Sequence, residues 1–251
     1  MRITIAGSTH AFYSQAAWRI ASQIITKPDS VIGLATGRTT GGIHKALCDI
    51  HKAHPFDVSQ VRVFGMDEVT GVSRDYFGSC YYMLLHEVVK PLGIPMAHYI
   101  MPPTMSDDFE RDGKIFQKAI QDLGGVDLQI LGIGENGHIG FNQPGTPFGS
   151  ETWLSKMDER LDARIRSETN SGPDADLGGL TIGIKDVMHS HRIILVANGT
   201  NKTDIVRQAL FGPITEDLPS SILQLHPFCE VMLDPDAAAG LECHSKECDT
   251  R

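Results

Sequence analysis

The chain has 251 residues, long enough for one α/β domain with a full core, and 41% of them are hydrophobic, as in ordinary globular proteins. Its formal net charge of -9 argues against non-specific binding to nucleic acid or to an anionic membrane, because both need a basic face. The charge does not exclude a small anionic substrate, since local cations and helix N-termini can bind one.

The N-terminal residues predict a short strand followed by polar residues, not the apolar core of a signal peptide. No apolar run approaches the roughly 18 residues of a membrane span. Five scattered cysteines favour reduced thiols in a cytoplasmic protein over a disulfide framework. In the tail, Cys243, His244 and Cys248 are too few to predict a metal site. We therefore expect a cytoplasmic protein that binds neither metal, membrane nor nucleic acid.

In chain order, short apolar runs predict strands at 2–6, 31–35, 61–66, 97–101, 126–133, 181–184, 192–197 and 229–233. Apolar stripes at helical spacing predict helices at 12–25, 43–53, 76–89 (ended by Pro91), 107–123, 202–210 and 220–224. This alternation predicts a doubly wound, mostly parallel α/β sheet with helices on both faces. No repeat or linker divides the chain, so we predict one domain over 1–240 and a polar tail over 241–251. The polar segment 150–177 is the least regular and a natural lid.

The first candidate site follows the predicted strand at 31–35, where residues 36–42 read TGRTTGG and precede a helix. Free backbone N–H groups, the helix macrodipole and threonine hydroxyls converge there, which makes an anion site plausible. The turn is not a Walker P-loop, because the lysine after its second glycine is missing. A tight turn with a purely structural role is the alternative.

The second candidate site is the pair Asp67 and Glu68, directly after the predicted strand at 61–66. Two adjacent carboxylates at the end of a buried strand are costly unless they are paired, solvated or used in function. A helix cap or a surface turn is the alternative interpretation.

The third candidate site is the loop after the predicted strand at 126–133, which contains glycines, one histidine and several amides. An apolar strand followed by a glycine-rich loop is how an open α/β sheet presents backbone to a ligand at its carboxyl edge. We interpret this loop as part of an active site; a surface turn whose histidine has no role is the alternative. Its polar members are Glu135, Asn136, His138, Asn142 and Gln143.

Four segments occur in an order that is similar to a known family: LATGRT at 34–39, FGMDE at 64–68, LGIGENGHIGFNQP at 131–144 and SILQLH at 221–226. They resemble the glucosamine-6-phosphate deaminase/isomerase family, a relative of the 6-phosphogluconolactonases, over about residues 2–235. The fold that this resemblance implies is a Rossmann-like doubly wound sheet, in agreement with the periodicity.

The resemblance implies an aldose–ketose isomerase and deaminase that converts glucosamine 6-phosphate, or the galactosamine equivalent, to a ketose phosphate and ammonia without metal or redox cofactor. Asp67 would move a proton between C2 and C1. His138 would assist ring opening, with Asn136 and Gln143 beside it. The implied substrate- and phosphate-binding residues are Thr36, Gly37, Arg38, Thr39, Glu68, Gly134, Gly137, Arg164 and Lys202. We expect a monomer or a small homo-oligomer.

The sequence departs from the family pattern at three positions. Gln143 replaces the usual glutamate that partners the histidine, and a neutral amide can orient imidazole but cannot stabilise imidazolium as a carboxylate does. Asn136 replaces an acid found in some members. Arg38 stands where a small residue is usual, and either adds a cation for the phosphate or fills part of the site. A 6-phosphogluconolactonase-type hydrolase and a weakly active phosphosugar-binding homologue are the alternatives.

Overall fold

A computed structural model of the chain describes residues 1–157, 159–172 and 174–241. Within these residues seven parallel strands form the main sheet, in the order β1-β10-β9-β6-β2-β3-β5. Their bounds are β1 Arg2–Ile5, β10 Cys229–Leu233, β9 Ile193–Ala197, β6 Leu128–Gly132, β2 Val31–Leu34, β3 Arg62–Gly65 and β5 Tyr99–Ile100. The predicted doubly wound, mostly parallel α/β sheet is confirmed.

Helices cover both faces of this sheet, because alternate strand residues point to opposite sides. In β9, Ile193 and Leu195 belong to one buried cluster, and Ile194 and Val196 to the other. The second face carries α1 (Thr9–Thr26), α2 (Arg38–Ala53) and the continuous helical run α3 (Cys80–Leu84), η1 (Leu85–Val89) and α4 (Lys90–Leu92). The first face carries α5 (Phe109–Asp122), α7 (Ile184–Met188), α8 (Thr203–Phe211), η4 (Pro219–Leu225) and α9 (Pro235–Ala238).

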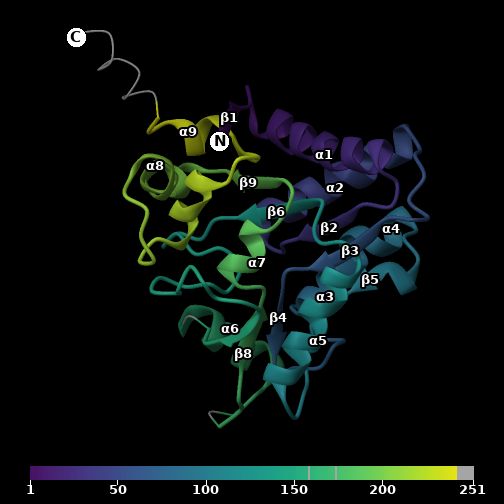
Figure 1. The fold of residues 1–251 in the computed structure, drawn as a ribbon, viewed down its shortest axis with the longest axis vertical. Helices are drawn as coiled ribbons and strands as arrows, with labels where there is room; N and C mark the ends of the chain where they lie inside the picture. The colour runs from purple at the N-terminus through teal and green to yellow at the C-terminus, as the bar shows by residue number, and fades with distance from the viewer. Residues whose placement is uncertain (158, 173, 242–251) are drawn as a thin grey trace.

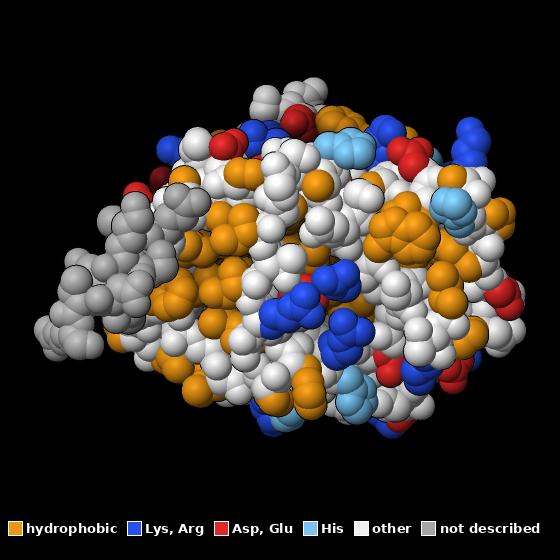
Figure 2. Space-filling model, turned by 90° about the horizontal axis from the view of Figure 1, so that it is seen from above, with side chains coloured by type: hydrophobic (Ala, Val, Ile, Leu, Met, Phe, Trp, Pro, Cys, Tyr) orange, Lys and Arg blue, Asp and Glu red, His pale blue; other side chains and the backbone are white. Residues whose placement is uncertain are grey.

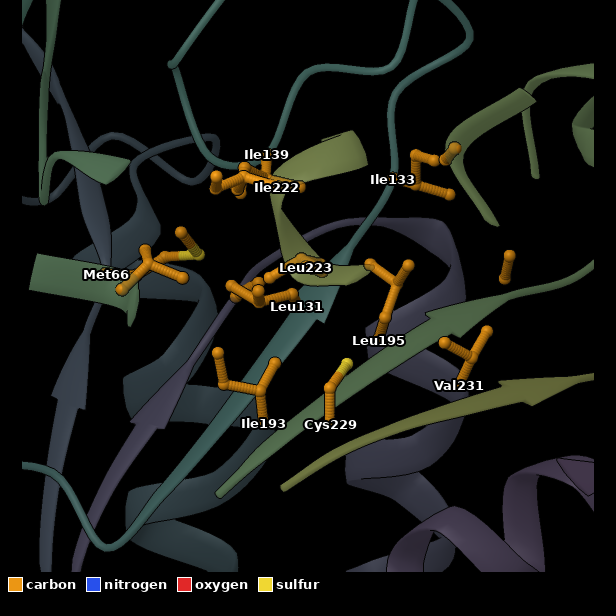
Figure 3. Close-up of a cluster of buried hydrophobic side chains, with 14 of the residues drawn as sticks. Met66, Leu131, Ile133, Ile139, Ile193, Leu195, Ile222, Leu223, Cys229 and Val231 are labelled. Atoms are coloured by element: carbon orange, nitrogen blue, oxygen red, sulfur yellow. The ribbon is translucent and has the colours of Figure 1, made fainter. Parts of the chain in front are cut away.

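The core of the first face centres on Leu131 of β6, which is fully buried. Figure 3 shows Leu131 beside Leu223 of η4, with Leu195 of β9 and Val231 of β10 following along the sheet. Ile139, from the loop after β6, packs into the same cluster. The glycine-rich loop is therefore attached to the core by its own apolar residue.

The winding of the chain reverses between the neighbouring strands β2 and β6. From β2 the chain continues outward to β3 and β5, and from β6 it continues outward to β9 and β10 on the other side. Ligands of open α/β sheets bind at such a switch point, outside the carboxyl ends of the strands. The turns after β2, β3, β6 and β9 all lie at this edge.

A second, antiparallel sheet has the order β4-β8-β7, with β4 at Asp67–Thr70, β8 at Gly178–Thr181 and β7 at Trp153–Ser155. Figure 1 places β4 and β8 at one end of the molecule, next to α6 (Glu159–Thr169). The expected irregularity of 150–177 is thus wrong, because the segment contains β7 and α6. Whether it closes as a lid stays a prediction.

The strand predicted at 181–184 is also wrong, since β8 ends at Thr181 and α7 begins at Ile184. The two glycines that open β8 have low strand propensity, so the pattern placed the strand too late. The amide of Ile184 is held by Ser150 Oγ at 3.0 Å, a contact between distant segments that starts the helix.

Two helices begin furthest from their predicted first residues. The second helix begins at Arg38 instead of residue 43, because the glycines before residue 43 do not break it. Gly42 lies inside the helix where it packs against α1, and a Cβ at this position would lie 2.4 Å from the Tyr13 ring. The third begins at Cys80 and continues past Pro91 to Leu92. Pro91 has no N–H for the carbonyl of Glu87, and the thiol of Cys48 donates to that carbonyl instead, at 3.2 Å.

Most of the predicted tail lies outside the described residues, which end at Leu241, and so do Cys243, His244 and Cys248. The single domain predicted over 1–240 stays a prediction. No helix in the described part of the chain has the length and hydropathy that crossing a membrane requires.

Leu131→Ala tests the packing of the central cluster. We expect it to lower the free energy of unfolding by about 2 to 5 kcal/mol, because it removes buried methyl groups and leaves a cavity. Urea unfolding measures the change, and Leu225→Ala is the matched control, since Leu225 is 62% exposed and should change stability by less than about 0.5 kcal/mol. Equal losses in the two variants would contradict the assignment of the core.

Candidate active site

The turn after β2 leads directly into the N-terminus of α2. Its N-cap residue, Gly37, has no side chain to bond the first N–H groups of the helix, so these donors point toward the carboxyl edge of the sheet. Thr39 Oγ1 donates to Asn198 Oδ1 on the turn after β9, at 2.5 Å, which ties two of the edge turns together. Thr36 is partly buried, and Gly37 and Arg38 are exposed. This arrangement suits an anion.

The two neighbouring acids have different surroundings. Glu68 is fully buried, and its carboxylate accepts the backbone N–H groups of Val69, Cys80 and Tyr81 at 2.7 to 2.8 Å. Burial raises the pKa of Glu68 to about 7, although these hydrogen bonds act in the opposite direction. Glu68, predicted to bind substrate, is therefore placed as the cap that fixes α3 to β4.

Asp67 is 7% exposed, and burial raises the pKa of its carboxyl to about 6, against a hydrogen bond from Cys80 that lowers it. The loop after β6 lies directly on this side chain. Gly140 has φ of +58°, and a Cβ there would lie 3.3 Å from Asp67 Oδ2 and 2.7 Å from Met66 Cε. Only glycine lets the loop approach the carboxylate so closely.

His138 is oriented by amides. Its Nδ1 lies 2.6 Å from Asn136 Oδ1, and Asn136 Nδ2 donates to Gln143 Oε1 at 3.0 Å. Because an amide oxygen only accepts, Nδ1 carries the proton of this contact. The structure thus places Gln143 one step away from the imidazole. Gly134 and Gly137 close the loop: Gly134 N–H donates to the His138 carbonyl, and Gly137 N–H to the Gly134 carbonyl.

Cations come together around Glu135 despite the negative net charge of the chain. A separate group of Lys and Arg side chains lies in the middle of the face seen from above in Figure 2, at the end of the molecule where Figure 1 places β1, α1 and α9. The pKa of Glu135 identifies the cations that lie near this side chain. Its pKa is lowered by a hydrogen bond from Asn201, then by the positive charges of Lys202, Arg160 and Arg38. These cations come from three elements, α2, α6 and η3 (Thr200–Lys202). Burial lowers the pKa of Lys202, and the positive charge of Arg38 lowers it further.

Helix α6 carries two arginines one turn apart: Arg164, which the resemblance implies as a phosphate-binding residue, and Arg160. Arg164 is exposed and pairs with Glu168 of the same helix at 3.8 Å, whereas the α6 charge that acts on Glu135 belongs to Arg160. Sequence reasoning missed Arg160. The two arginines are four residues apart and lie on the same side of the helix, so the sequence pattern favours neither of them. Only the packing of α6 shows which one lies near Glu135.

Among the described residues no group of three or more His, Cys, Asp or Glu side chains is placed to hold a metal ion. The site itself offers a carboxyl with a pKa near neutrality, an imidazole oriented by an amide, and a set of anion-binding groups, which together suit proton transfer on a bound anion.

Comparison with known proteins agrees with this geometry. Residues 7–230 match the family model described as glucosamine-6-phosphate isomerases/6-phosphogluconolactonase. The chain belongs to this family. A glucosamine-6-phosphate deaminase from Clostridium botulinum (strain Loch Maree / Type A3) is 41% identical over 241 residues, which covers 96% of this chain and 99% of the relative.

Two solved structures of the family share the fold. A monomeric glucosamine-6-phosphate deaminase of the NagB superfamily is 32% identical, with a TM-score of 0.89 and coverage of 96% of this chain and 100% of that one. The 6-phosphogluconolactonase from Trypanosoma cruzi is 19% identical, with a TM-score of 0.76 and coverage of 96% and 97%. The second likeness concerns the fold alone.

Asp67→Asn tests the burial of the acid through the pH dependence of stability. A carboxyl whose pKa rises from about 4 in the unfolded chain to about 6 in the fold destabilises the protein once it ionises. That penalty is absent below pH 4, grows between pH 4 and 6 and is constant above. We therefore expect the amide variant to be more stable than wild type at pH 8, on the order of 2 to 3 kcal/mol, with the gap closing toward pH 4.

Urea unfolding at several pH values measures this gap. Asp217→Asn is the control, because Asp217 is exposed and its substitution should leave the pH dependence unchanged. A gap that is the same at pH 4 and pH 8 would show that Asp67 is not desolvated by the fold.

Proposed function

We propose that this protein converts glucosamine 6-phosphate and water to fructose 6-phosphate and ammonia, and that it acts in amino-sugar catabolism. The observation that carries the proposal is the position of Asp67, a buried carboxyl that the Gly140 loop covers and that shares one sheet edge with His138 and the anion-binding turn. The 41% identity to a glucosamine-6-phosphate deaminase over nearly the whole chain supports the same reaction.

The phosphate of the substrate binds at the N-terminus of α2. The first N–H groups of the helix donate to its oxygens, since a helix N-terminus is a ready anion site. The hydroxyl of Thr39 exchanges Asn198 Oδ1 for a phosphate oxygen when the substrate binds. Arg38, Arg160 and Lys202 supply the positive charge that a dianion needs. The phosphate thus anchors the sugar and leaves its C1 and C2 to reach the strand ends.

His138 opens the sugar ring. With Nδ1–H held by Asn136, Nε2 accepts the proton of the C1 hydroxyl and returns it to the ring oxygen. A neutral imidazole is sufficient for this relay, because one proton is taken and one is given back. The neutral Gln143 agrees with it, since its partner is Asn136 and no carboxylate is required to stabilise an imidazolium.

Asp67 then removes the proton from C2 of the open-chain sugar and returns it to C1. The amine gives up a proton as the C1 carbonyl oxygen takes one up, so that C1 becomes an alcohol and the C2–N bond an imine. Water then adds to C2 and the nitrogen leaves, which gives the ketose phosphate and ammonia. A carboxyl with a pKa of about 6 suits both halves of the transfer, because it is ionised at neutral pH and still a competent acid when protonated.

The same proposal covers the setting of the enzyme. We propose a monomer or small homo-oligomer that acts in the cytoplasm, where phosphorylated sugars are retained by their charge. The monomeric state of the solved deaminase relative supports the smaller assembly.

The assay that tests the proposal measures ammonia and ketose-phosphate release from glucosamine 6-phosphate, with galactosamine 6-phosphate alongside. We expect turnover of the first sugar and a fall in kcat of about 10² to 10⁴ in Asp67→Asn, because the variant cannot carry the proton. Asp217→Asn is the matched control and should keep full activity. Hydrolysis of 6-phosphogluconolactone without deamination would favour the lactonase alternative. Thermal stabilisation by the sugar phosphate without turnover would favour a binding homologue.

A second test compares two arginines on one helix. Arg160→Ala should raise KM for the sugar phosphate about tenfold, because the cation near Glu135 and Lys202 is lost. Arg164→Ala should change KM less than about twofold, since that side chain is exposed and pairs within α6. Initial rates over a range of substrate concentrations give both values. The reverse order would return the phosphate role to Arg164, as the resemblance implies.

A further inference from the structure

Cys80 lies between two parts of the candidate site that are far apart in the sequence. It is the first residue of α3 and is 4% exposed. Its Sγ lies 3.2 Å from Thr36 Oγ1, on the turn that leads into α2, and 3.5 Å from Asp67 Oδ1, at the start of β4. The backbone of Cys80 is itself held, because its N–H donates to the buried carboxylate of Glu68 at 2.8 Å.

The surroundings of this thiol disfavour the thiolate form. A helix N-terminus normally favours the thiolate. Here burial, followed by the negative charges of Asp67 and Glu68, raises the pKa of Cys80 well above its ordinary value. The side chain therefore stays protonated at neutral pH and remains a hydrogen-bond donor.

The direction of the two contacts follows from the number of protons. A thiol carries one proton, and an ionised carboxylate can only accept. The S–H of Cys80 therefore donates to Asp67 Oδ1, and the sulfur accepts the hydroxyl proton of Thr36. This gives a one-way chain from the turn before α2, through the sulfur, to the carboxylate.

We infer that Cys80 is a positioning residue that couples the phosphate-binding turn to Asp67 and adjusts the basicity of that carboxylate. The inference rests on the proposed function and deepens it. Binding of a phosphate at the α2 N-terminus orders Thr36, Thr36 fixes the sulfur, and the sulfur fixes one oxygen of the base. The remaining oxygen, Oδ2, faces the Gly140 loop.

The groups that face Asp67 make this coupling measurable. Among the described residues, the titratable neighbours are Glu68 on the same strand and Cys80 on α3. Gly140 and Thr181 of β8, which also pack against Asp67 or its strand, carry no charge. A substitution at position 80 therefore acts on Asp67 chiefly through the thiol hydrogen bond.

The experiment compares Cys80→Ala with Cys80→Ser in kcat/KM for glucosamine 6-phosphate against pH. Loss of the donor disfavours the ionised carboxylate, so the acid limb of the Cys80→Ala profile should move to higher pH by about half to one unit. Cys80→Ser keeps a donor, and its limb should stay within about 0.3 units of wild type. Cys80→Val fills the site without a donor and should shift the limb as Cys80→Ala does.

These outcomes separate a positioning role from simple packing. If Cys80 only fills space, the alanine and serine variants lower the unfolding temperature and leave the acid limb where it is in wild type, which overturns the inference. The valine variant keeps the test valid if alanine at this position does not fold, because it retains the buried volume.

If the proposed function is wrong, the wild-type protein itself will show no deaminase turnover, and no pH profile of activity can be recorded. The inference is then tested directly by ¹³C NMR titration of the aspartate carboxyl carbons, with the Asp67 resonance identified by its absence from Asp67→Asn. A higher pKa of Asp67 in Cys80→Ala than in wild type and Cys80→Ser supports the coupling. An unchanged pKa of Asp67 in all three overturns it.

Discussion

Because the chain winds outward in opposite directions from β2 and β6, the crossover helices leave the carboxyl ends of these strands open side by side. The candidate site depends on this reversal. The helix after β2 directs its N-terminal donors to the opening, and the loop after β6 brings His138 to it. The neighbouring strands β3 and β9 add Asp67 and Lys202 from their own ends. The groups are distant in sequence and adjacent only through the strand order.

Burial of the two acids is the second constraint, and the fold treats them unequally. Glu68 recovers part of its lost hydration through three backbone N–H groups, so it serves as a structural anchor. From the described part of the chain, Asp67 receives one hydrogen bond, from a thiol at 3.5 Å. Its carboxylate is left poorly solvated, which destabilises the fold and makes the group a stronger base. Such an exchange of stability for reactivity is common at functional sites.

Electrostatics at the edge are divided between a cationic part and a neutral part. Arg38, Arg160 and Lys202 concentrate positive charge near Glu135 in a chain whose net charge is -9. The relay through His138, Asn136 and Gln143 instead consists of an imidazole and two amides. The first suits a phosphate dianion, and the second suits proton transfer by a ring that starts and ends neutral.

The sequence by itself determined the parallel α/β architecture, because continuous apolar runs alternating with amphipathic stripes admit few other arrangements. It also placed the TGRT turn, Asp67 and the His138 loop at strand ends, since glycines and polar residues follow each run directly. It could not show that Glu68 caps a helix while its neighbour Asp67 faces the opening. Successive residues of a strand point to opposite sides, and which side is which depends on the partner elements.

Only the tertiary structure decided the remaining features. It distinguished Arg160 from Arg164, made Gly42 a contact point inside α2, and brought Cys80 between Thr36 and Asp67. It also turned 150–177 into a strand and a helix that complete the small sheet. Each of these features is a contact between segments distant in the sequence. Local propensity and periodicity carry no information about such contacts, because they describe neighbours along the chain and not neighbours in space.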